Sequence, residues 1–527
     1  MTAHKPLALT AATIAAAMAL AACSGGAASN SASDAIEIGS LYEPVNLSNI
    51  AGGGQGVTEA LNGNVYEGLF YLADDGTIQP QRATSYDVSE DGLTYTFHLR
   101  EGVTFSDGTA FDAADAVHSI NRVLAEDSQS ARKSQLAVIN SVEATDPQTL
   151  TVTLSQRSIS LPYNLSYLWM VPEGFDSQTE TDGTGPYTLA SREADARTVL
   201  KAYPAYWGKG QFPLDVTELQ YVPIKSAATR VAALLSGEVD FLQDVPAQDV
   251  ARLKADEHLM VKSGLENRTI FLGLDVGSEV LRHSSVKDRN PLADARVREA
   301  LALAIDRDAI RKAVMRGLSS PTGILAPPFV NGYTEALAAF PKADPARARQ
   351  LLAEAGYPQG FTLTLDAPND RYVNDEAIAT AVAGFLGRIG VKVTVQARPF
   401  ALHNAVLTKG ESDFYLYGWG VPTHDSAYVF DYLVHTRGKN RLGTWNITGY
   451  SNADIDAQIE SLSTEADRNK RNATIARIWE ATKQAGFYIP LHDQMITSAA
   501  RRGIEVPLHP NNITYFKFVT VQGPTRQ

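Results

Sequence analysis

Cysteine is almost absent from this sequence, since Cys23 is the single one among 527 residues. One thiol cannot form an internal disulfide, and it cannot supply a cysteine-rich zinc site. Positively charged residues are outnumbered, since the sequence has 46 Lys and Arg and 59 Asp and Glu. The net charge is −13 with neutral histidine. Proteins whose main task is to bind a nucleic-acid backbone present a basic surface, so this balance argues against that class.

Motifs of catalysis are missing as well. The sequence contains no Gly-x-Ser-x-Gly nucleophile elbow, no His-Glu-x-x-His zinc motif and no Gly-Lys-Ser/Thr phosphate loop. Its ten histidines are scattered, and no two stand four residues apart on an expected helix to share a metal. His424 is expected on a surface loop. We therefore predict no catalytic residue, no metal ligand and no cofactor.

Long apolar runs are confined to the N-terminus. Residues 1–22 carry His4 and Lys5, then an apolar run from Leu7, and the small residues before Cys23 complete a secretory signal peptide. No other run reaches the ~18 apolar residues that a membrane-spanning helix needs. The four residues 20–23 (LAAC) resemble the lipobox of bacterial lipoproteins, in which the cysteine is lipidated and the signal removed.

A polar tether of Ser, Gly and Ala follows, over residues 23–35. Such a composition has nothing to bury and spaces a folded body away from a surface. We therefore expect a protein that is lipid-anchored at Cys23 on the extracytoplasmic face of the bacterial cell membrane.

The full sequence is 44% hydrophobic and 20% charged, and its length suggests about three domain-sized units. Asp-Gly turn signals between β-rich runs predict an α+β unit over residues 64–155, with one helix at 113–124 that Asp112 caps. Residues 183–270 alternate strands with a helix at 227–236, which predicts an open α/β sheet.

Helices dominate from about residue 293 onward. Asp344 and Pro345 begin one of them, and a strand, helix and strand at 361–365, 375–389 and 391–395 predict a βαβ unit with a parallel strand pair. Asn374 is expected to cap the middle helix. The remaining elements are predicted as helices at 453–462 and 467–484 and strands at 488–491 and 513–520.

Seven blocks, in this order, resemble the extracytoplasmic solute-binding proteins of ABC importers, in the peptide and nickel binding family (family 5). The blocks are 65–70 (VYEGLF), 99–109 (LREGVTFSDGT), 111–117 (FDAADAV), 183–187 (GTGPY), 206–208 (YWG), 236–240 (SGEVD) and 297–307 (VREALALAIDR). The resemblance extends over roughly residues 36–527.

This resemblance implies an α/β fold, a two-lobed periplasmic-binding-protein clamp with an extra inserted α+β domain. Lobe I would combine residues 36–57, 183–268 and 491–527, the inserted domain would be 58–182, and lobe II would be 269–490. Ligand would lie between the lobes, and closure would be a hinge motion that the solute stabilises.

The function implied is that of a monomeric, lipid-anchored substrate-binding protein, which captures oligopeptides or peptide-like solutes and delivers them to the permease and ATPase subunits of an importer. No nucleic-acid partner is expected. Two alternatives stay open at this point: a receptor for nickel or another metal chelate, and an exported hydrolase on the same scaffold.

The candidate ligand residues come from the same resemblance. Residues 417–425 (YGWGVPTHD) look like the inner edge of the family's second lobe, where glycine permits close approach and Trp419 offers an apolar plane with one N–H donor. Peptide-binding relatives often place an aspartate three residues after this tryptophan, where this chain has Pro422, and Asp425 could take over its charge. Core packing of Trp419 and helix capping by Asp425 are the alternatives. The candidates are Tyr42, Trp419, Gly420, Thr423, Asp425, Trp445 and Asn446.

Overall fold

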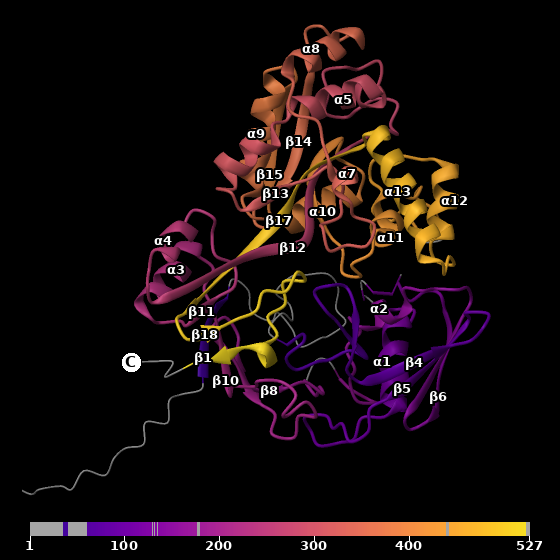
Figure 1. Cartoon of the computed structure of the whole chain (residues 1–527). Coiled ribbons are helices and arrows are strands. Elements are labelled where there is room, and N and C mark those ends of the chain that lie inside the picture. The colour runs from indigo at the N-terminus through magenta and orange to yellow at the C-terminus, as the bar shows by residue number, and fades with distance from the viewer. Residues whose placement is uncertain are drawn as a thin grey trace, which may run out of the picture.

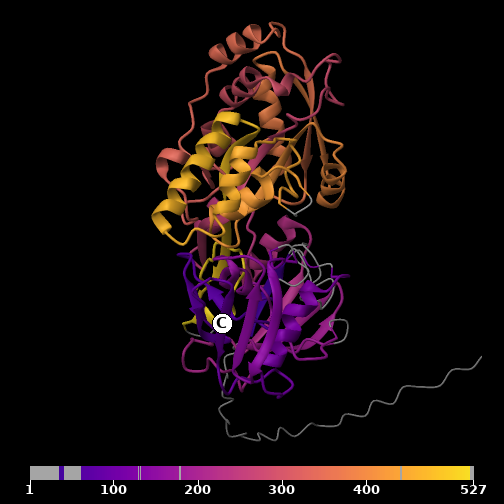
Figure 2. The ribbon, with the colours of Figure 1, turned by 90° about the vertical axis from the view of Figure 1, so that its right-hand side faces the viewer.

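The computed structural model describes residues 35–40 and 61–522, except 129, 131, 134, 177–179 and 439–441. The predicted signal peptide, the lipidation site Cys23 and the candidate Tyr42 lie outside these residues. The chain folds into a lower body and an upper body, one above the other (Figures 1 and 2). Within the described ranges, no helix combines the length and the apolar character needed to cross a membrane.

One eleven-stranded sheet runs through both bodies, in the order β15-β14-β16-β12-β17-β11-β1-β10-β9-β8, with β13 paired to β17. Its lower strands are β8 (Tyr187–Glu193), β9 (Arg197–Ala202), β10 (Glu218–Pro223), β1 (Ala35–Ser40) and β11 (Phe241–Leu242). Its upper strands are β13 (Ser319–Pro321), β14 (Thr362–Pro368), β15 (Lys392–Arg398) and β16 (Phe414–Gly420).

Two long neighbouring strands connect the bodies, β12 (Leu259–Leu274) and β17 (Tyr488–Arg501), as Figure 1 shows. Their antiparallel register shifts between Leu265, opposite Met495, and Thr269, opposite Asp493. Three residues of β12 therefore face one residue of β17, which is a bulge, and bulges bend and twist a strand pair. Both expected lobe boundaries, 268/269 and 490/491, fall inside these strands.

The lower body closes around a core that includes Phe241 and Phe516. Helices α3 (Ala227–Ser236) and α4 (Val250–Lys254) cover a smaller cluster beside it. Helix α3 spans the predicted residues, with Ser226 as its N-cap and Gly237 as its C-cap. The strand predicted at 513–520 is wrong, because this segment holds the 3-10 turn η4 (Phe516–Phe518), and only β19 (Thr520–Val521) pairs, with β18 (Ile504–Glu505). The Asn64 side chain satisfies this backbone instead, since it accepts from Phe516 N at 3.0 Å and donates to Thr514 O at 2.9 Å.

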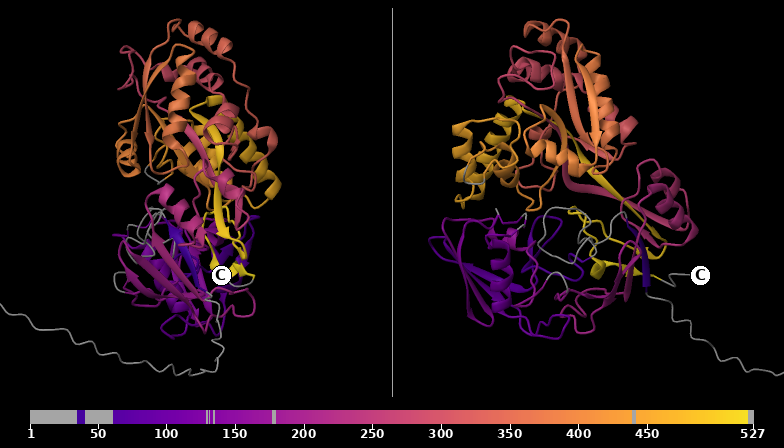
Figure 3. Two further views of the ribbon diagram at one scale, coloured as in Figure 1. Left: turned by 90° about the vertical axis from the view of Figure 1, so that its left-hand side faces the viewer. Right: turned by 180° about the vertical axis from the view of Figure 1, so that it is seen from behind.

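The inserted α+β domain occupies one side of the lower body (Figure 3, right). Its four-stranded sheet has the order β4 (Ala83–Val88), β5 (Thr94–Leu99), β7 (Thr149–Leu154), β6 (Ile139–Asp146). Helix α1 (Ala113–Leu124) packs on it, and Asp112 caps α1 in a capping box with Asp115, as predicted. The hairpin β2 (Phe70–Leu72) and β3 (Ile78–Pro80) and the short α2 (Leu161–Leu165) complete it.

The upper body contains the predicted βαβ unit, in which β14 and β15 are parallel and α9 (Asp375–Gly387) connects them. Asn374 stands at the N-cap position of α9 as predicted, but its side chain makes no capping hydrogen bond. The Asp375 carboxylate accepts from Arg371 N and Tyr372 N of the preceding loop, each at 3.0 Å. The same core holds α5 (Ala295–Ala304), α6 (Arg307–Ala309), α8 (Pro345–Glu354) and the turns η1 (Pro291–Ala293) and η2 (Ile310–Val314).

A second core of the upper body faces the inserted domain (Figure 3, right). It is built by α7 (Glu335–Ala338), α10 (Phe400–Thr408), α11 (Ser426–Val429), the π-helical turn η3 (Phe430–Val434), α12 (Ala453–Ser461) and α13 (Arg468–Ala485). The whole is the α/β two-lobed clamp with an inserted α+β domain that the resemblance implied.

Candidate ligand-binding cleft

A cavity of about 510 Å³ lies where the inserted domain meets the upper body. The inserted domain contributes small polar side chains to its wall, among them Gln135, Ser158, Ser160 and Asn164. The upper body contributes Thr423, Asp425, Tyr428, Asp431, Tyr432, Glu460 and Arg471. Direct hydrogen bonds bridge the two sides, from Ile159 N to Ser463 O at 3.4 Å and from Gln135 Nε2 to Tyr428 Oη at 3.2 Å. Both halves of the molecule therefore build the cavity wall.

Asp425 is held by protein groups on both of its oxygens. Its carboxylate accepts from Ala427 N at 2.9 Å, which caps α11, and from Arg471, whose Nη1 and Nη2 lie 2.7 and 2.8 Å from Oδ2 and Oδ1. Asn331 Nδ2 donates to it as well, at 3.0 Å. A bidentate arginine pair fixes orientation as well as charge. Asp425 thereby fixes the start of α11 at the cavity wall, and its negative charge is already balanced.

The helix after Asp425 widens at η3, where His435 N donates to Phe430 O five residues earlier. Such π turns are frequent at functional sites, because they re-aim the side chains of one turn. Here Tyr428, Asp431 and Tyr432 all line the cavity, with the two tyrosine rings 4.8 Å apart between centroids.

Asp431 differs from Asp425 in that no described residue donates a hydrogen bond to its carboxyl group. Burial and, to a smaller extent, the charge of Asp425 raise the pKa of Asp431 to about 7, although His435 and Arg471 act in the opposite direction. A half-buried carboxyl without a described hydrogen-bond donor resists ionisation until a positive charge arrives.

Trp419 is buried against the same tyrosines. Its ring centroid lies 5.9 Å from Tyr428, 5.7 Å from Tyr432 and 5.9 Å from Trp445. Among the described residues, neither its indole N–H nor the buried Thr423 hydroxyl has a hydrogen-bond partner. Most buried polar atoms in proteins are paired, so unpaired ones call for an explanation such as a missing ligand or water.

At Gly418 and Gly420, the groups that approach the backbone closely belong to neighbouring strands and loops of the protein. Gly420 pairs with Arg268 in the sheet, and an added Cβ there would lie 3.2 Å from Asn267 Oδ1. A Cβ at Gly418 would lie 2.8 Å from Ile270 Cδ1 and from the Tyr372 ring. Gly418 therefore lets the Tyr372 ring lie against β16.

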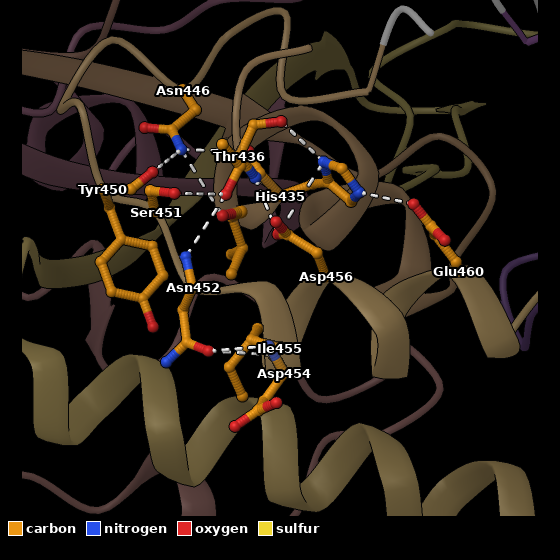
Figure 4. A network of polar contacts seen from close by, with 11 residues as sticks. His435, Thr436, Asn446, Tyr450, Ser451, Asn452, Asp454, Ile455, Asp456 and Glu460 are labelled. Carbon is orange, nitrogen blue, oxygen red and sulfur yellow. Dashed lines mark hydrogen bonds and ion pairs between the residues drawn. The ribbon is translucent and has the colours of Figure 1, made fainter.

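Asn446 lies behind the cavity wall in a loop network (Figure 4). Its amide nitrogen donates to Tyr450 O at 2.8 Å and to His435 O at 3.0 Å, and its amide oxygen accepts from Thr448 Oγ1 at 2.8 Å. Trp445 beside it stacks on Tyr417, with 5.8 Å between ring centroids. Of the candidates that the structure describes, Thr423 and Asp425 line the cavity, Trp419 and Trp445 back it, and Gly420 and Asn446 support the backbone.

His424 is not on the surface, so that expectation is wrong. Its residue is 5% exposed, its backbone is left-handed with φ 49°, and its ring lies 5.0 Å from the Phe329 ring centroid. It meets the Asp74 to Gly76 turn of the lower body, where an added Cβ on Gly76 would lie 3.5 Å from His424 Cβ. Burial lowers the pKa of His424 to about 4, although Asp74 and Asp75 raise it in part. The contact between the two bodies buries this ring.

The sequence analysis missed a second polar cluster at the bulge between β12 and β17. Arg268 Nε donates to Glu266 Oε1 at 3.0 Å, and both side chains are largely buried. Gln494, the residue opposite the bulge, donates to Glu266 and accepts from Val373 N at 3.1 Å. The triplets 266–268 (ENR) and 492–494 (HDQ), polar interruptions in strand-like runs, were the available signal.

Charges from both bodies converge on this cluster. Burial raises the pKa of Asp244, next to β11, and nearby Glu266 raises it further, whereas Arg230 and Arg371 lower it. Arg371 also lies over the Phe400 ring, with Cζ 5.2 Å from the centroid. Among residues with described positions, no group of three His, Cys, Asp or Glu side chains could hold a metal ion.

Comparison with known proteins identifies a family that matches this chain. Residues 77–441 match the family described as bacterial extracellular solute-binding proteins, family 5 Middle. The glutathione-binding protein of Salmonella paratyphi A is 28% identical over 474 residues, which cover 87% of each chain.

Solved structures agree in fold. The binding protein AgaA of A. tumefaciens R10, in complex with agropinic acid, superposes with a TM-score of 0.78 at 25% identity, over 93% of this chain and 99% of that one. The binding protein DppA of Helicobacter pylori, in complex with the peptide STSA, superposes with a TM-score of 0.76 at 21% identity, over 93% of this chain and 98% of that one. These similar proteins are named as binding proteins, not as enzymes.

Proposed function

Because the chain belongs to family 5 of the bacterial extracellular solute-binding proteins, we propose that it captures oligopeptides or peptide-like solutes for an ABC importer by closure of its two lobes. The observation that carries this proposal is the cavity whose wall comes from both bodies, since a ligand there bridges them and favours their approach. The chain would bind the solute and leave it chemically unchanged.

The class of solute rests on the similar proteins and on the cavity wall. The relative is named for glutathione, and one of the two structural neighbours was solved with a peptide. The wall supplies hydroxyl and amide groups on one side and tyrosine rings on the other. Peptide backbones offer the matching donors and acceptors.

Within this proposal the seven candidate residues take different roles. Thr423 contacts the solute, because it lines the cavity and its buried hydroxyl has no partner among the described residues, whereas Trp419 lies behind the wall and packs against its tyrosine rings. Asp425 positions α11, Trp445 supports the Trp419 ring, and Gly420 and Asn446 shape the backbone around them. Tyr42 remains a candidate because it follows Ser40, the last residue of β1.

We also propose the anchored arrangement and the domain boundaries that the sequence suggests. Removal of residues 1–22 would leave a lipidated Cys23, the tether 23–35 and a monomeric clamp that serves permease and ATPase subunits. Lobe I would be 36–57, 183–268 and 491–527, the inserted domain 58–182 and lobe II 269–490. Radiolabelled palmitate that is incorporated into the wild type and not into Cys23→Ala would support the anchor, and equal incorporation would contradict it.

The experiment for solute capture is a thermal-shift screen with glutathione, mixed di- to pentapeptides and the nickel–histidine chelate as probes. We expect a peptide probe to raise Tm and to reduce the radius of gyration in X-ray scattering. Chromatography of the incubated peptides should recover them intact. Stabilisation by the nickel chelate alone, or cleavage of the peptides, would favour one of the two alternative functions.

A further inference from the structure

Apolar side chains that are only half-buried line the cavity from both of its sides. Tyr428 and Tyr432 belong to the upper body, Val138 and Ile159 belong to the inserted domain, and each keeps part of its surface exposed. The two tyrosine rings are 4.8 Å apart between centroids, so they form one continuous aromatic surface. Contact between water and apolar surface is unfavourable, and an apolar group that replaced the water here would remove that contact.

The two sides of the cavity belong to different hydrophobic cores. The tyrosines pack on the upper-body core that contains Ile459 and Leu462, which line the cavity as well, whereas Val138 packs on the core of the inserted domain. The cores come close here, since Ile159 N donates to Ser463 O at 3.4 Å. An apolar group between them would cover surface of both cores at once, which favours the arrangement in which the two bodies approach.

Much of the polar part of the wall is already hydrogen-bonded within the protein. Side chains of the wall with such a partner are Gln135, Ser155, Ser158, Asn164, Asp425, Glu460 and Arg471. Burial is the main cause that raises the pKa of Asp431 to about 7, so near neutral pH this carboxyl is uncharged in a large share of the molecules. The Thr423 hydroxyl stays available to the solute backbone. The wall therefore offers apolar surface more than unsatisfied polar groups.

We propose that the cavity binds an apolar side chain of the solute, of the size of leucine or phenylalanine, with Tyr428 and Tyr432 on one side of it and Val138 and Ile159 on the other. This inference rests on the solute-capture function above and adds the chemical class of the side chain that is recognised. The cavity volume of about 510 Å³ lies within the range of small-molecule pockets, about 300–1,000 Å³.

The test compares the wild type with one variant in each wall, Ile159→Ser and Tyr432→Ser, and with the control Val88→Ser. Both cavity positions are half-buried, and thermal unfolding verifies that each variant folds. Val88 lies 45% exposed on β4 of the inserted domain and does not line the cavity. The control therefore removes a branched apolar side chain from the same domain as Ile159 without changing the wall.

The probes are glycine-based tripeptides in which one position, rotated through all three, is Leu, Phe, Ser or Glu. Glutathione and the mixed di- to pentapeptides of the screen above serve as probes of solute capture itself. Isothermal titration calorimetry at several temperatures measures the affinity and the heat-capacity change of binding. Burial of apolar surface makes this heat-capacity change negative, which a purely structural effect of a substitution would not reproduce.

We expect the wild type and Val88→Ser to bind the best Leu or Phe peptide at least about tenfold more tightly than its Ser and Glu counterparts, with a more negative heat-capacity change. Both cavity variants should reduce this preference at least threefold.

Equal affinity of the wild type for the four kinds of peptide, or an unchanged preference in either cavity variant, would overturn this inference and leave solute capture intact. Binding of glutathione or the mixed peptides without any binding of the glycine-based peptides would overturn it in the same way. Failure of every probe to bind the wild type would reject both this inference and the capture of peptides.

Discussion

At the scale of single residues, the pair of Asp425 and Arg471 links the candidate segment to α13. Replacing Arg471 with methionine keeps the packing of the side-chain stem and leaves a largely buried carboxylate without its cation. We expect Arg471→Met to lower the free energy of unfolding by about 3 kcal/mol, measured by urea denaturation. The exposed Arg477→Met on the same helix is the control, and it should change stability by less than about 0.5 kcal/mol. Equal midpoints for the two variants would contradict this role of the pair.

The two roles open to Asp425, helix cap and cation partner, could not be separated from the sequence. A cap is a local property, and Asp425 caps α11 as its position before a helix allows. Its cation is Arg471, 46 residues further on, which no local pattern associates with it. His424 was misjudged for the same reason, since Phe329 and the Asp74 to Gly76 turn, which lie against it, are distant in sequence.

At the scale of elements, the bulge between β12 and β17 depends on Gln494. Its side chain joins Glu266 in β12 to Val373 N in the loop before α9. Replacement by the similarly sized, apolar methionine leaves both groups without that partner, and an unsatisfied buried group costs about 1–3 kcal/mol. We expect Gln494→Met to lower stability by that amount in urea denaturation. Gln359→Met, at an exposed position, should have no measurable effect, and a loss of equal size there would refute the argument.

Helices were predicted better than the long strands, and the reason is physical. Caps such as Asp112, Ser226 and Asp467 act within one turn, so their helices begin where the sequence indicates. The strand predicted at 488–491 continues to Arg501, because Asp493 and Gln494 find polar partners in the bulge region and do not end the strand. An alternation of apolar and polar residues cannot reveal such partners.

At the scale of the whole molecule, His424 should make the contact between the bodies sensitive to acid. Its folded pKa, about 4, lies below the ordinary 6.5, so between these pH values the unfolded chain binds a proton that the folded chain refuses. The stability it contributes is complete above pH 6.5 and is lost as the pH falls toward 4. His424→Asn should flatten this dependence by ~2 kcal/mol, and asparagine tolerates the left-handed backbone there.

The measurement is thermal unfolding and X-ray scattering of both proteins from pH 7 to pH 4.5. We expect the wild type to lose more stability and to expand more than His424→Asn over this range, because burial of the ring disfavours its protonated form more than Asp74 and Asp75 favour it. Parallel curves for the two proteins would show that the ring does not couple pH to the contact.

The upper body is entered through β12 and left through β17, and these strands are neighbours, with Gly273 opposite Tyr488. The two ends of the segment between β12 and β17 therefore lie side by side. A tight hairpin turn could replace this segment without moving the lower strands. Chimaeras that exchange this segment between relatives should consequently fold, with half of the binding wall transplanted and the other half kept.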